Sequence, residues 1–527
     1  MKLQTRTTLF LLTALLTASS FLSCSDSGST SAVDTTSTVD DAQTTAPVEE
    51  VTADLYEGLE AKDLGGDIFH VVGQNTTSRQ NFWFEDLEGN IVNDAIHDRD
   101  RAVEERLNIK LEFTSHEDRQ EAASMLQRAV NAGDETYDMI ITALSQGINT
   151  LTTGEMLLDL REIPHLTLDS IYWNKSMYEN MHFFGKQYFT TGPISAQLYQ
   201  TPIVMMFNKR LANDLDLGNL YQIVLDGAWT VDKLAEMSKD FSSDINSDGK
   251  MDENDQWGLV IDGTFGNALY TGAELDTVAR TDDSYTLTLD SAQSVAVIDK
   301  CTALFGDRKQ VINDKEGSKG YNKIFRDGRA LFMDYTILGT MSMRDMDDDF
   351  GIIPCPKFDE NQKQYYSACN TWLPSGIGIP MLCSNPEDTG LIMETMARAS
   401  YDIMVPAIYE KTLHGKVARD DESSLMLDII FENAAFDFNT VFNFADTSTL
   451  LRYAVTGDQK TLSRHIPRNR LPHRKLLTRS LRLQKRMDNG QETDYVRSTS
   501  KRYRILTESH QRHRYRCHPE DQSTDRG

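Results

Sequence analysis

The 527-residue sequence has few basic residues, no closely spaced cysteines and no common catalytic signature. It carries 53 Lys and Arg against 80 Asp and Glu, with a formal net charge of −27, which argues against nucleic acid as a partner of the main body. Its six cysteines show no C-x-x-C spacing, so neither a zinc site nor a redox site is indicated and cysteine pairing stays open. G-x-S-x-G, H-E-x-x-H and P-loop motifs are missing, which argues against an enzyme of the classes that carry them.

The amino terminus predicts export and a lipid anchor. A signal peptide is predicted over 1–23, where two basic residues precede an apolar run over 9–22, too short to cross ~30 Å of hydrocarbon as a helix. Leu-Ser-Cys at 22–24 has the order of a bacterial lipobox, so we expect lipidation of Cys24; an ordinary signal with an incidental cysteine is the alternative. Residues 24–59, rich in Ser, Thr and Asp, predict a disordered tether. The expected location is the extracytoplasmic face of the cell membrane.

Strands and helices alternate in the body of the chain. Strands are expected over 67–73, 108–113 and 137–143, where β-branched and apolar residues run together. Helices are expected between them, over 94–108 and 118–132. Further elements are expected over 202–208, 230–241, 329–335, 349–356 and 391–413. The β-α-β-α-β order predicts a parallel sheet covered by helices.

Several stretches follow one another in a characteristic order. They are YDMIITA, GEMLLDL, YWNKSMYENMHFFGKQYF, VMMFNKRLANDLDL, GAWTVDKLAEMSKDF, GRALFMDY and DFGIIPCPKFDENQKQYY, followed by the helical stretch 391–413. Together they resemble the extracellular solute-binding proteins of the maltose-binding type, which are receptor lipoproteins of ABC importers. The resemblance covers roughly residues 60–455 and rests on the order and spacing of the stretches.

The resemblance implies an α/β fold of the two-lobe, periplasmic-binding-protein-like type II class, with a hinge and an interlobe cleft. Each lobe is expected to be discontinuous, the first over 60–165 and 320–360 and the second over 166–319 and 361–456. The implied function is binding without catalysis. The protein would capture a carbohydrate, an oligosaccharide above all, and deliver it to ABC permease subunits.

An acidic loop over 244–255, DINSDGKMDEND, has the spacing of an EF-hand calcium loop. The ligand positions are taken by Asp244, Asn246, Asp248, the Lys250 carbonyl, Asp252 and Asp255. Gly249 stands where such a loop turns sharply. The last ligand is Asp instead of Glu, and a strand-like segment follows, so this is no helix-loop-helix pair. We expect a structural Ca²⁺; a calcium-free acidic turn is the alternative.

Aromatic residues indicate where a sugar could stack, because ring faces suit the C–H-rich faces of pyranoses. Trp83, Trp173 and Trp372 are candidate ligand contacts, since they follow strand ends or the expected crossings between lobes. Trp229 and Trp257 are expected to be structural. Weaker candidates at strand ends are Asn75, Glu85, Asp334 and Tyr335. Ordinary core packing is the alternative for each tryptophan.

Two other classes of function share these features. A secreted, calcium-stabilised glycosidase would also be acidic and aromatic, and its paired carboxylates need only a certain separation. A surface adhesin could use the calcium loop to stiffen a carbohydrate-binding module. The lipid anchor, the tether and the order of the stretches favour a binding receptor.

The last part of the chain differs in composition from the rest. Residues 451–527 hold 19 Lys and Arg against 8 Asp and Glu. The resemblance ends near residue 457, and apolar residues in 457–527 keep no helical or strand period. A shifted reading frame or a disordered tail explains this; a natural basic arm that binds anionic polymer or membrane is the alternative.

Overall fold

The computed structural model describes residues 54–74, 82–281, 285–289, 291–314, 319–413, 421–442 and 451–452. The predicted signal peptide, Cys24, Asn75 and the tail over 457–527 lie outside these residues. Within the described residues, none of the helices combines the length and the apolar character that a membrane span requires.

A first sheet has the strand order β12-β3-β1-β2. Its parallel strands are β1 (Asp67–Gln74), β2 (Ile109–His116) and β3 (Met139–Ala143). The fourth strand, β12 (Ser375–Gly378), runs antiparallel to β3. The parallel sheet expected from the alternating pattern is therefore confirmed, and a distant part of the chain completes it.

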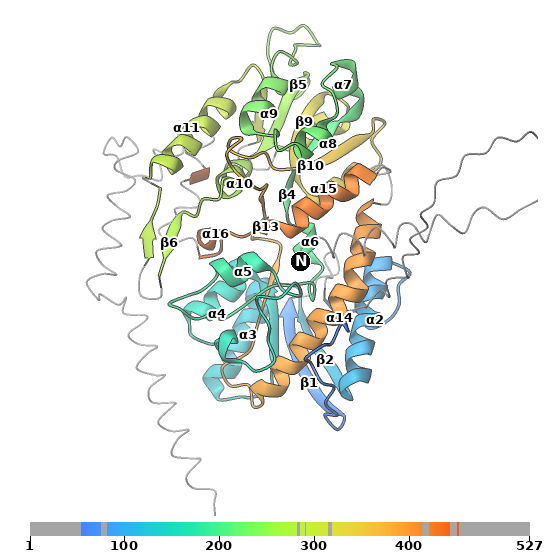
Figure 1. Ribbon diagram of the computed structural model, residues 1–527, viewed down its shortest axis with the longest axis vertical. Helices are drawn as coiled ribbons and strands as arrows, with labels where there is room; N and C mark the ends of the chain where they lie inside the picture. Colours follow the sequence, from blue (N-terminus) through green and yellow to red (C-terminus); the bar gives the residue numbers. More distant parts are fainter. Residues whose placement is uncertain are drawn as a thin grey trace, which may run out of the picture. The chain divides into compact units, whose positions relative to one another are not determined.

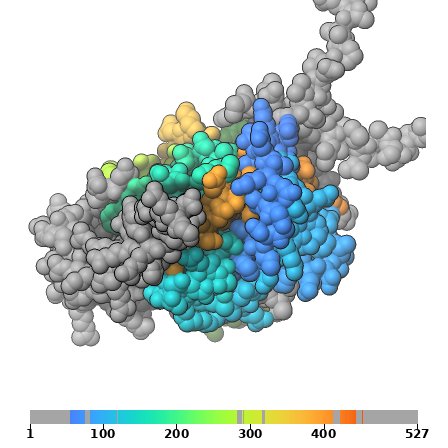
Figure 2. Space-filling view, turned by 90° about the horizontal axis from the view of Figure 1, so that it is seen from below, coloured from blue at the N-terminus to red at the C-terminus, as the bar shows by residue number. Residues whose placement is uncertain are grey.

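Helices α2 (Ile91–Leu107), α3 (Arg119–Ala132) and α14 (Pro386–Leu413) cover this sheet. The side chain of Asn90 caps α2 by accepting a hydrogen bond from a backbone N–H of the first turn, so the helix begins before the expected start at residue 94. Helix α14 continues through Pro406 and packs along α2, as Figure 1 shows. In Figure 2 the orange residues from the region of β12 and α14 lie among the blue and cyan residues of the early chain.

A second sheet has the strand order β10-β4-β9-β5-β8. Its strands are β4 (Ile203–Asn208), β5 (Trp257–Asp262), β8 (Val311–Asp314), β9 (Ala330–Thr336) and β10 (Phe350–Pro354). Strands β5, β8 and β9 run parallel, while β4 runs antiparallel to its two neighbours. The helices around this sheet include α7 Lys209–Asp214, α8 Leu220–Leu225, α9 Val231–Ser238, α10 Phe265–Gly272, α11 Ala292–Gly306 and α15 Asp421–Glu432.

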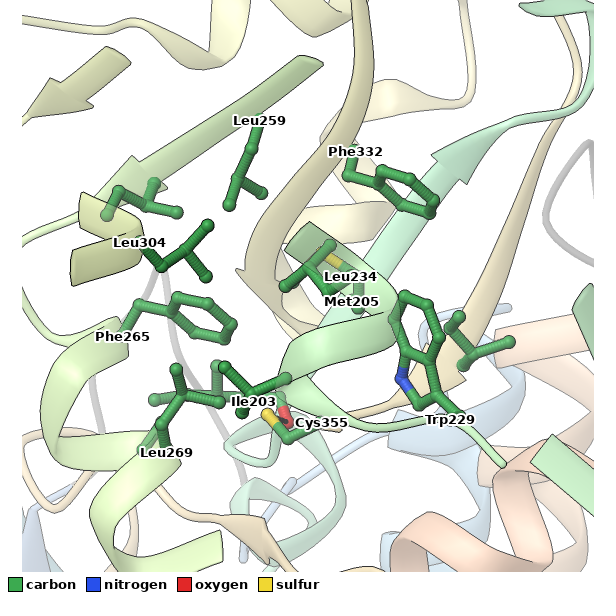
Figure 3. Packing of buried hydrophobic residues seen from close by; sticks show 14 of the residues in the cluster. Ile203, Met205, Trp229, Leu234, Leu259, Phe265, Leu269, Leu304, Phe332 and Cys355 are labelled. Carbon is green, nitrogen blue, oxygen red and sulfur yellow. Dashed lines mark hydrogen bonds between the residues drawn. The ribbon is translucent and has the colours of Figure 1, made fainter. Parts of the chain in front are cut away.

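The core of the second sheet is built around Trp229, which is fully buried. The centroids of the Trp229 and Phe332 rings lie 5.7 Å apart, and the indole N–H of Trp229 donates to the Pro354 carbonyl at 3.0 Å. Figure 3 shows Met205 and Leu234 beside it. The partnered N–H explains how a tryptophan can be fully buried at low cost. The expectation that Trp229 is structural agrees with this packing.

The two sheets define two lobes, each with a main hydrophobic core of its own. Lobe 1 consists of the described residues of 54–195 and 371–413, and lobe 2 of those of 203–366 and 421–432. Val103 and Ile141 are fully buried in the main core of lobe 1. Leu259 is fully buried in that of lobe 2. Each sheet therefore has its own apolar layer against which its helices pack.

The sheet topology corrects the predicted division of the chain. Strands β9 and β10 pair with β4 and β5, so 320–360 belongs to lobe 2 and not to the first lobe. Strand β12 pairs with β3 and α14 packs on α2, so 371–413 belongs to lobe 1 and not to the second lobe. Residues 166–195 also belong to lobe 1, since Thr190 pairs with Ile377 of β12. Long-range strand pairing, which local patterns do not encode, decides all three assignments.

Three segments that cross between the lobes run side by side, and we call them the hinge segments: 196–202, 367–370 and 433–437. The Asn370 N–H donates to the Thr201 carbonyl at 3.0 Å. Strands β11 (Ser367–Ala368) and β13 (Ala434–Ala435) pair in parallel. Backbone hydrogen bonds therefore join the three segments, as expected for a hinge.

The segment 54–59 is docked on lobe 1. The guanidinium of Arg398 donates to the Leu55 carbonyl at 3.1 Å. The guanidinium of Arg106 lies 3.7 Å from the ring centroid of Tyr56, a favourable cation–π arrangement. The tether predicted over 24–59 is therefore too long at its carboxyl end, because these residues have partners that a composition argument does not see.

Candidate functional site

In each lobe, the carboxyl end of one parallel strand lies next to a hinge segment. In lobe 2, Thr336 at the end of β9 pairs with Ile203, which directly follows a hinge segment. In lobe 1, Ala143 at the end of β3 pairs with Ser375, which lies just beyond another hinge segment. Ligands of open α/β sheets bind at the carboxyl ends of strands. The region beside the hinge segments is therefore the candidate site.

On the lobe 1 side, the loop after β3 lies against the hinge. The Ser145 hydroxyl donates to the Thr371 carbonyl at 2.8 Å. The next residue, Gln146, is exposed and has a φ of 68°, a left-handed conformation that costs a non-glycine residue roughly 1–3 kcal/mol. Such strain concentrates at ligand sites. Sequence reasoning missed Gln146; its place directly after a buried strand was the available signal.

Trp372 lies beside this loop. It follows Thr371, the acceptor for Ser145, and its backbone N–H is held by the Asn370 side chain at 3.0 Å. Its side chain is 53% exposed, which is unusual for so large an apolar group. The structure thus brings Trp372 and Gln146 to the same hinge-side edge of lobe 1.

The other two tryptophan candidates have core partners. Trp173 is 4% exposed, and its indole N–H donates to Glu394 at 2.8 Å. Trp83 is half-buried and stacks on Phe113, with ring centroids 5.2 Å apart. Core packing, the alternative stated for both residues, accounts for these contacts. Glu85, close to Trp83 in sequence, is exposed.

On the lobe 2 side, Asp334 and Tyr335 lie at the end of β9. Asp334 is 4% exposed and accepts a hydrogen bond from the Asp262 N–H at 2.9 Å. Burial, followed by the nearby Asp262 carboxylate, raises the pKa of Asp334 well above its usual value. The Tyr335 hydroxyl accepts from Asn322 at 3.2 Å. Asp334 is therefore a buried group that favours its neutral form, whereas Tyr335 is partly exposed at this edge.

In the acidic loop over 244–255, backbone N–H groups donate hydrogen bonds to the carboxylates of the same loop. The Gly249 N–H, at a φ of 78°, donates to Asp244 at 2.8 Å. The two carboxylate oxygens of Asp255 accept from the N–H groups of Ile245, at 3.2 Å, and Asp252, at 2.8 Å. These bonds give the loop the sharp turn that the glycine position predicts.

One buried oxygen of this loop favours a bound cation. Oδ1 of Asp244 is buried and has no hydrogen-bond partner, and a buried carboxylate oxygen without a donor is costly unless a cation or water approaches it. Within the described residues, however, no group of three His, Cys, Asp or Glu side chains is gathered closely enough to hold a metal ion. The short Asp255 binds backbone N–H groups instead of closing the loop.

Comparison with known proteins gives structural matches only. No family model matches the sequence, and no curated protein matches it. The chain is similar to a cyclo/maltodextrin-binding protein complexed with maltotetraose, with 11% identity and a TM-score of 0.52 over 76% of this chain and 94% of that one. It is also similar to the maltose-binding periplasmic protein of Listeria monocytogenes in complex with maltose, with 14% identity and a TM-score of 0.50 over 76% and 95% of the two chains. The chain has the periplasmic-binding-protein fold.

The periplasmic-binding-protein fold confirms the fold class expected from the sequence. It also gives the hinge segments their place, between two α/β lobes whose strand ends face them. At identities this low the likeness concerns the fold, so the residues of the site are argued from their own geometry.

Proposed function

We propose that this protein is the extracellular substrate-binding lipoprotein of an ABC transporter and captures a carbohydrate, an oligosaccharide above all, for import. The observation that carries the proposal is the exposed Trp372 at the point where the strand ends of lobe 1 meet the hinge segments. An exposed indole at such a place offers a flat apolar face to a sugar ring.

Hydrogen-bonding groups beside the indole suit sugar hydroxyls. Gln146 carries both a donor and an acceptor, and its left-handed backbone holds it at the carboxyl end of β3. Tyr335 lies near the end of β9, at the corresponding edge of lobe 2, and its hydroxyl contacts Asn322. In this proposal the ring stacks on Trp372, Gln146 bonds hydroxyls from one lobe, and Tyr335 bonds them from the other.

The structural comparisons support binding without turnover. The two similar proteins are named as binding proteins, and their structures hold maltotetraose and maltose. Capture is followed by delivery to ABC permease subunits, and lipidation of Cys24 retains the protein at the membrane. A structural Ca²⁺ is also part of the proposal: Asp244, Asn246, Asp248 and the Lys250 carbonyl would hold it, and the ion would neutralise the acidic loop of lobe 2.

A binding titration tests the proposal. The mature chain, residues 24–527, is titrated calorimetrically with maltose and maltotetraose, and with a tripeptide and spermidine as other ligand classes. We expect binding of a sugar, with the sugar recovered unchanged after long incubation. Hydrolysis of the sugar would show a glycosidase instead, and binding of only the peptide or the polyamine would overturn the carbohydrate assignment.

A further inference from the structure

A short hairpin of lobe 2 contacts lobe 1. Its strands β6 (Val278–Arg280) and β7 (Tyr285–Leu287) lie between α10 and α11 in the chain. Val278 is 2% exposed and packs in a hydrophobic cluster whose members come largely from lobe 1, including Phe189. The hairpin therefore places an apolar side chain in a cluster that is shared with lobe 1.

Arg280 adds polar contacts across the same junction. Its guanidinium donates to Asn180 on α5 (Lys175–Asn180) of lobe 1 at 3.3 Å. The same group pairs with Asp276 at 3.0 Å and lies 4.9 Å from the ring centroid of Phe438. The arginine side chain is only 8% exposed, so solvent screens these contacts weakly.

Asp437 joins the hairpin to the end of a hinge segment. Its Oδ1 accepts from the N–H and the hydroxyl of Thr277, each at 3.4 Å. Its Oδ2 accepts from the Thr440 N–H at 2.9 Å. The helix that follows, α16 (Phe438–Phe442), is fixed to lobe 1, since Asn149 donates to the Val441 carbonyl at 3.2 Å.

Charged and titratable groups surround Asp437 from each neighbouring element. Burial is the main cause that raises the pKa of Asp437 to about 7, and the carboxylate of Asp276 raises it further. The N–H groups that Thr277 and Thr440 donate, and after them Arg280, act in the opposite direction and lower it. Tyr270 of α10 also faces this group; burial, and then the Asp437 and Asp276 charges, raise the pKa of its phenol.

We propose that the β6–β7 hairpin is a clasp between the two lobes, and that loss of a proton from Asp437 loosens it. In the clasped arrangement the buried carboxyl is favoured in its neutral form. A released Asp437 meets water and returns to its ordinary pKa of 3.8. The clasp is therefore strongest in acid and weakens as the pH rises from about 4 to about 7, by about tenfold in its opening constant for each pH unit.

Hydrogen exchange of the full mature chain tests the clasp without any ligand. Protection factors for the backbone amides of 276–281 are measured by mass spectrometry at pH 5, 6, 7 and 8, with labelling times scaled to the intrinsic exchange rates. In the wild type, protection should fall roughly fiftyfold between pH 5 and pH 7 and then level off. In Asp437→Asn, which keeps an acceptor but has no proton to lose, it should stay high at every pH.

Two arginine variants provide the matched comparison. Arg280→Met should lower protection of 276–281 at every pH, whereas Arg210→Met, which breaks the Asp348 ion pair within lobe 2, should leave it unchanged. A flat wild-type profile, or an equal fall in Asp437→Asn, would overturn the proposal. An equal fall in the amides of β5 would show unfolding of the whole lobe and would overturn it as well.

Discussion

Replacing Glu394 with alanine should destabilise lobe 1 by about 3–5 kcal/mol, the usual cost of removing one partner of a buried ion pair. Glu394 is fully buried on α14. Its carboxylate accepts from the indole N–H of Trp173 at 2.8 Å and from Arg398 at 3.0 Å. It also accepts from the backbone N–H of Thr167 at 3.1 Å. Without the carboxylate, the buried indole N–H of Trp173 loses its acceptor, and so does the Nε–H of Arg398, whose side chain is 8% exposed.

Urea unfolding followed by tryptophan fluorescence measures this cost. Glu394→Gln keeps the shape and one acceptor oxygen, so it should lose about 1.5–3 kcal/mol, the range for hydrogen bonds to charged groups. Glu236→Ala is the control, because its ion pair with Lys233 leaves the glutamate side chain 70% exposed and is worth less than about 1 kcal/mol. If Glu394→Ala costs no more than Glu236→Ala, the argument from burial is wrong.

Three further outcomes are expected. Chelation should lower the melting temperature, and Asp244→Ala with Asp248→Ala should remove that response. Ligand linkage predicts a stabilisation of about 1–3 kcal/mol for calcium well above its Kd. Identical melting with and without chelator would show that the loop is a plain acidic turn. Trp372→Ala should weaken sugar binding by about 1 kcal/mol or more, measured by calorimetry, while the exposed control Leu215→Ala should bind normally. Limited proteolysis of 24–527 should remove the chain beyond about residue 460 first; a tail as resistant as the lobes would contradict both the frameshift and the disordered-tail hypotheses.

Local sequence patterns predicted where the strands lie better than which strands they pair with. The strands expected over 329–335 and 349–356 are present as β9 and β10. Their lobe was wrong, because the choice between two sheets depends on pairing with β4 and β5 far away in the sequence. The hydrophobic period and the composition of a segment indicate whether a strand is buried. They do not indicate which sheet the strand joins.

Sequence patterns were equally limited in predicting which single residues of the candidate site are exposed. Trp173 and Trp372 are both tryptophans near expected crossings, yet one is 4% and the other 53% exposed. Trp173 packs in the main core of lobe 1, where Glu394, far along the chain, accepts its indole N–H. Gln146 was missed because a left-handed backbone at a glutamine is a product of the folded loop.

The segment 54–59 is bound to lobe 1 by two arginines. Arg398 and Arg106 hold this segment on lobe 1, so a pulling force applied through the chain before residue 54 is transmitted to lobe 1 alone. Rotation about the hinge segments then moves lobe 2 relative to the point of attachment. If Cys24 is lipidated as proposed, lobe 1 is the lobe tied to the membrane, and lobe 2 is the lobe that turns about the hinge segments.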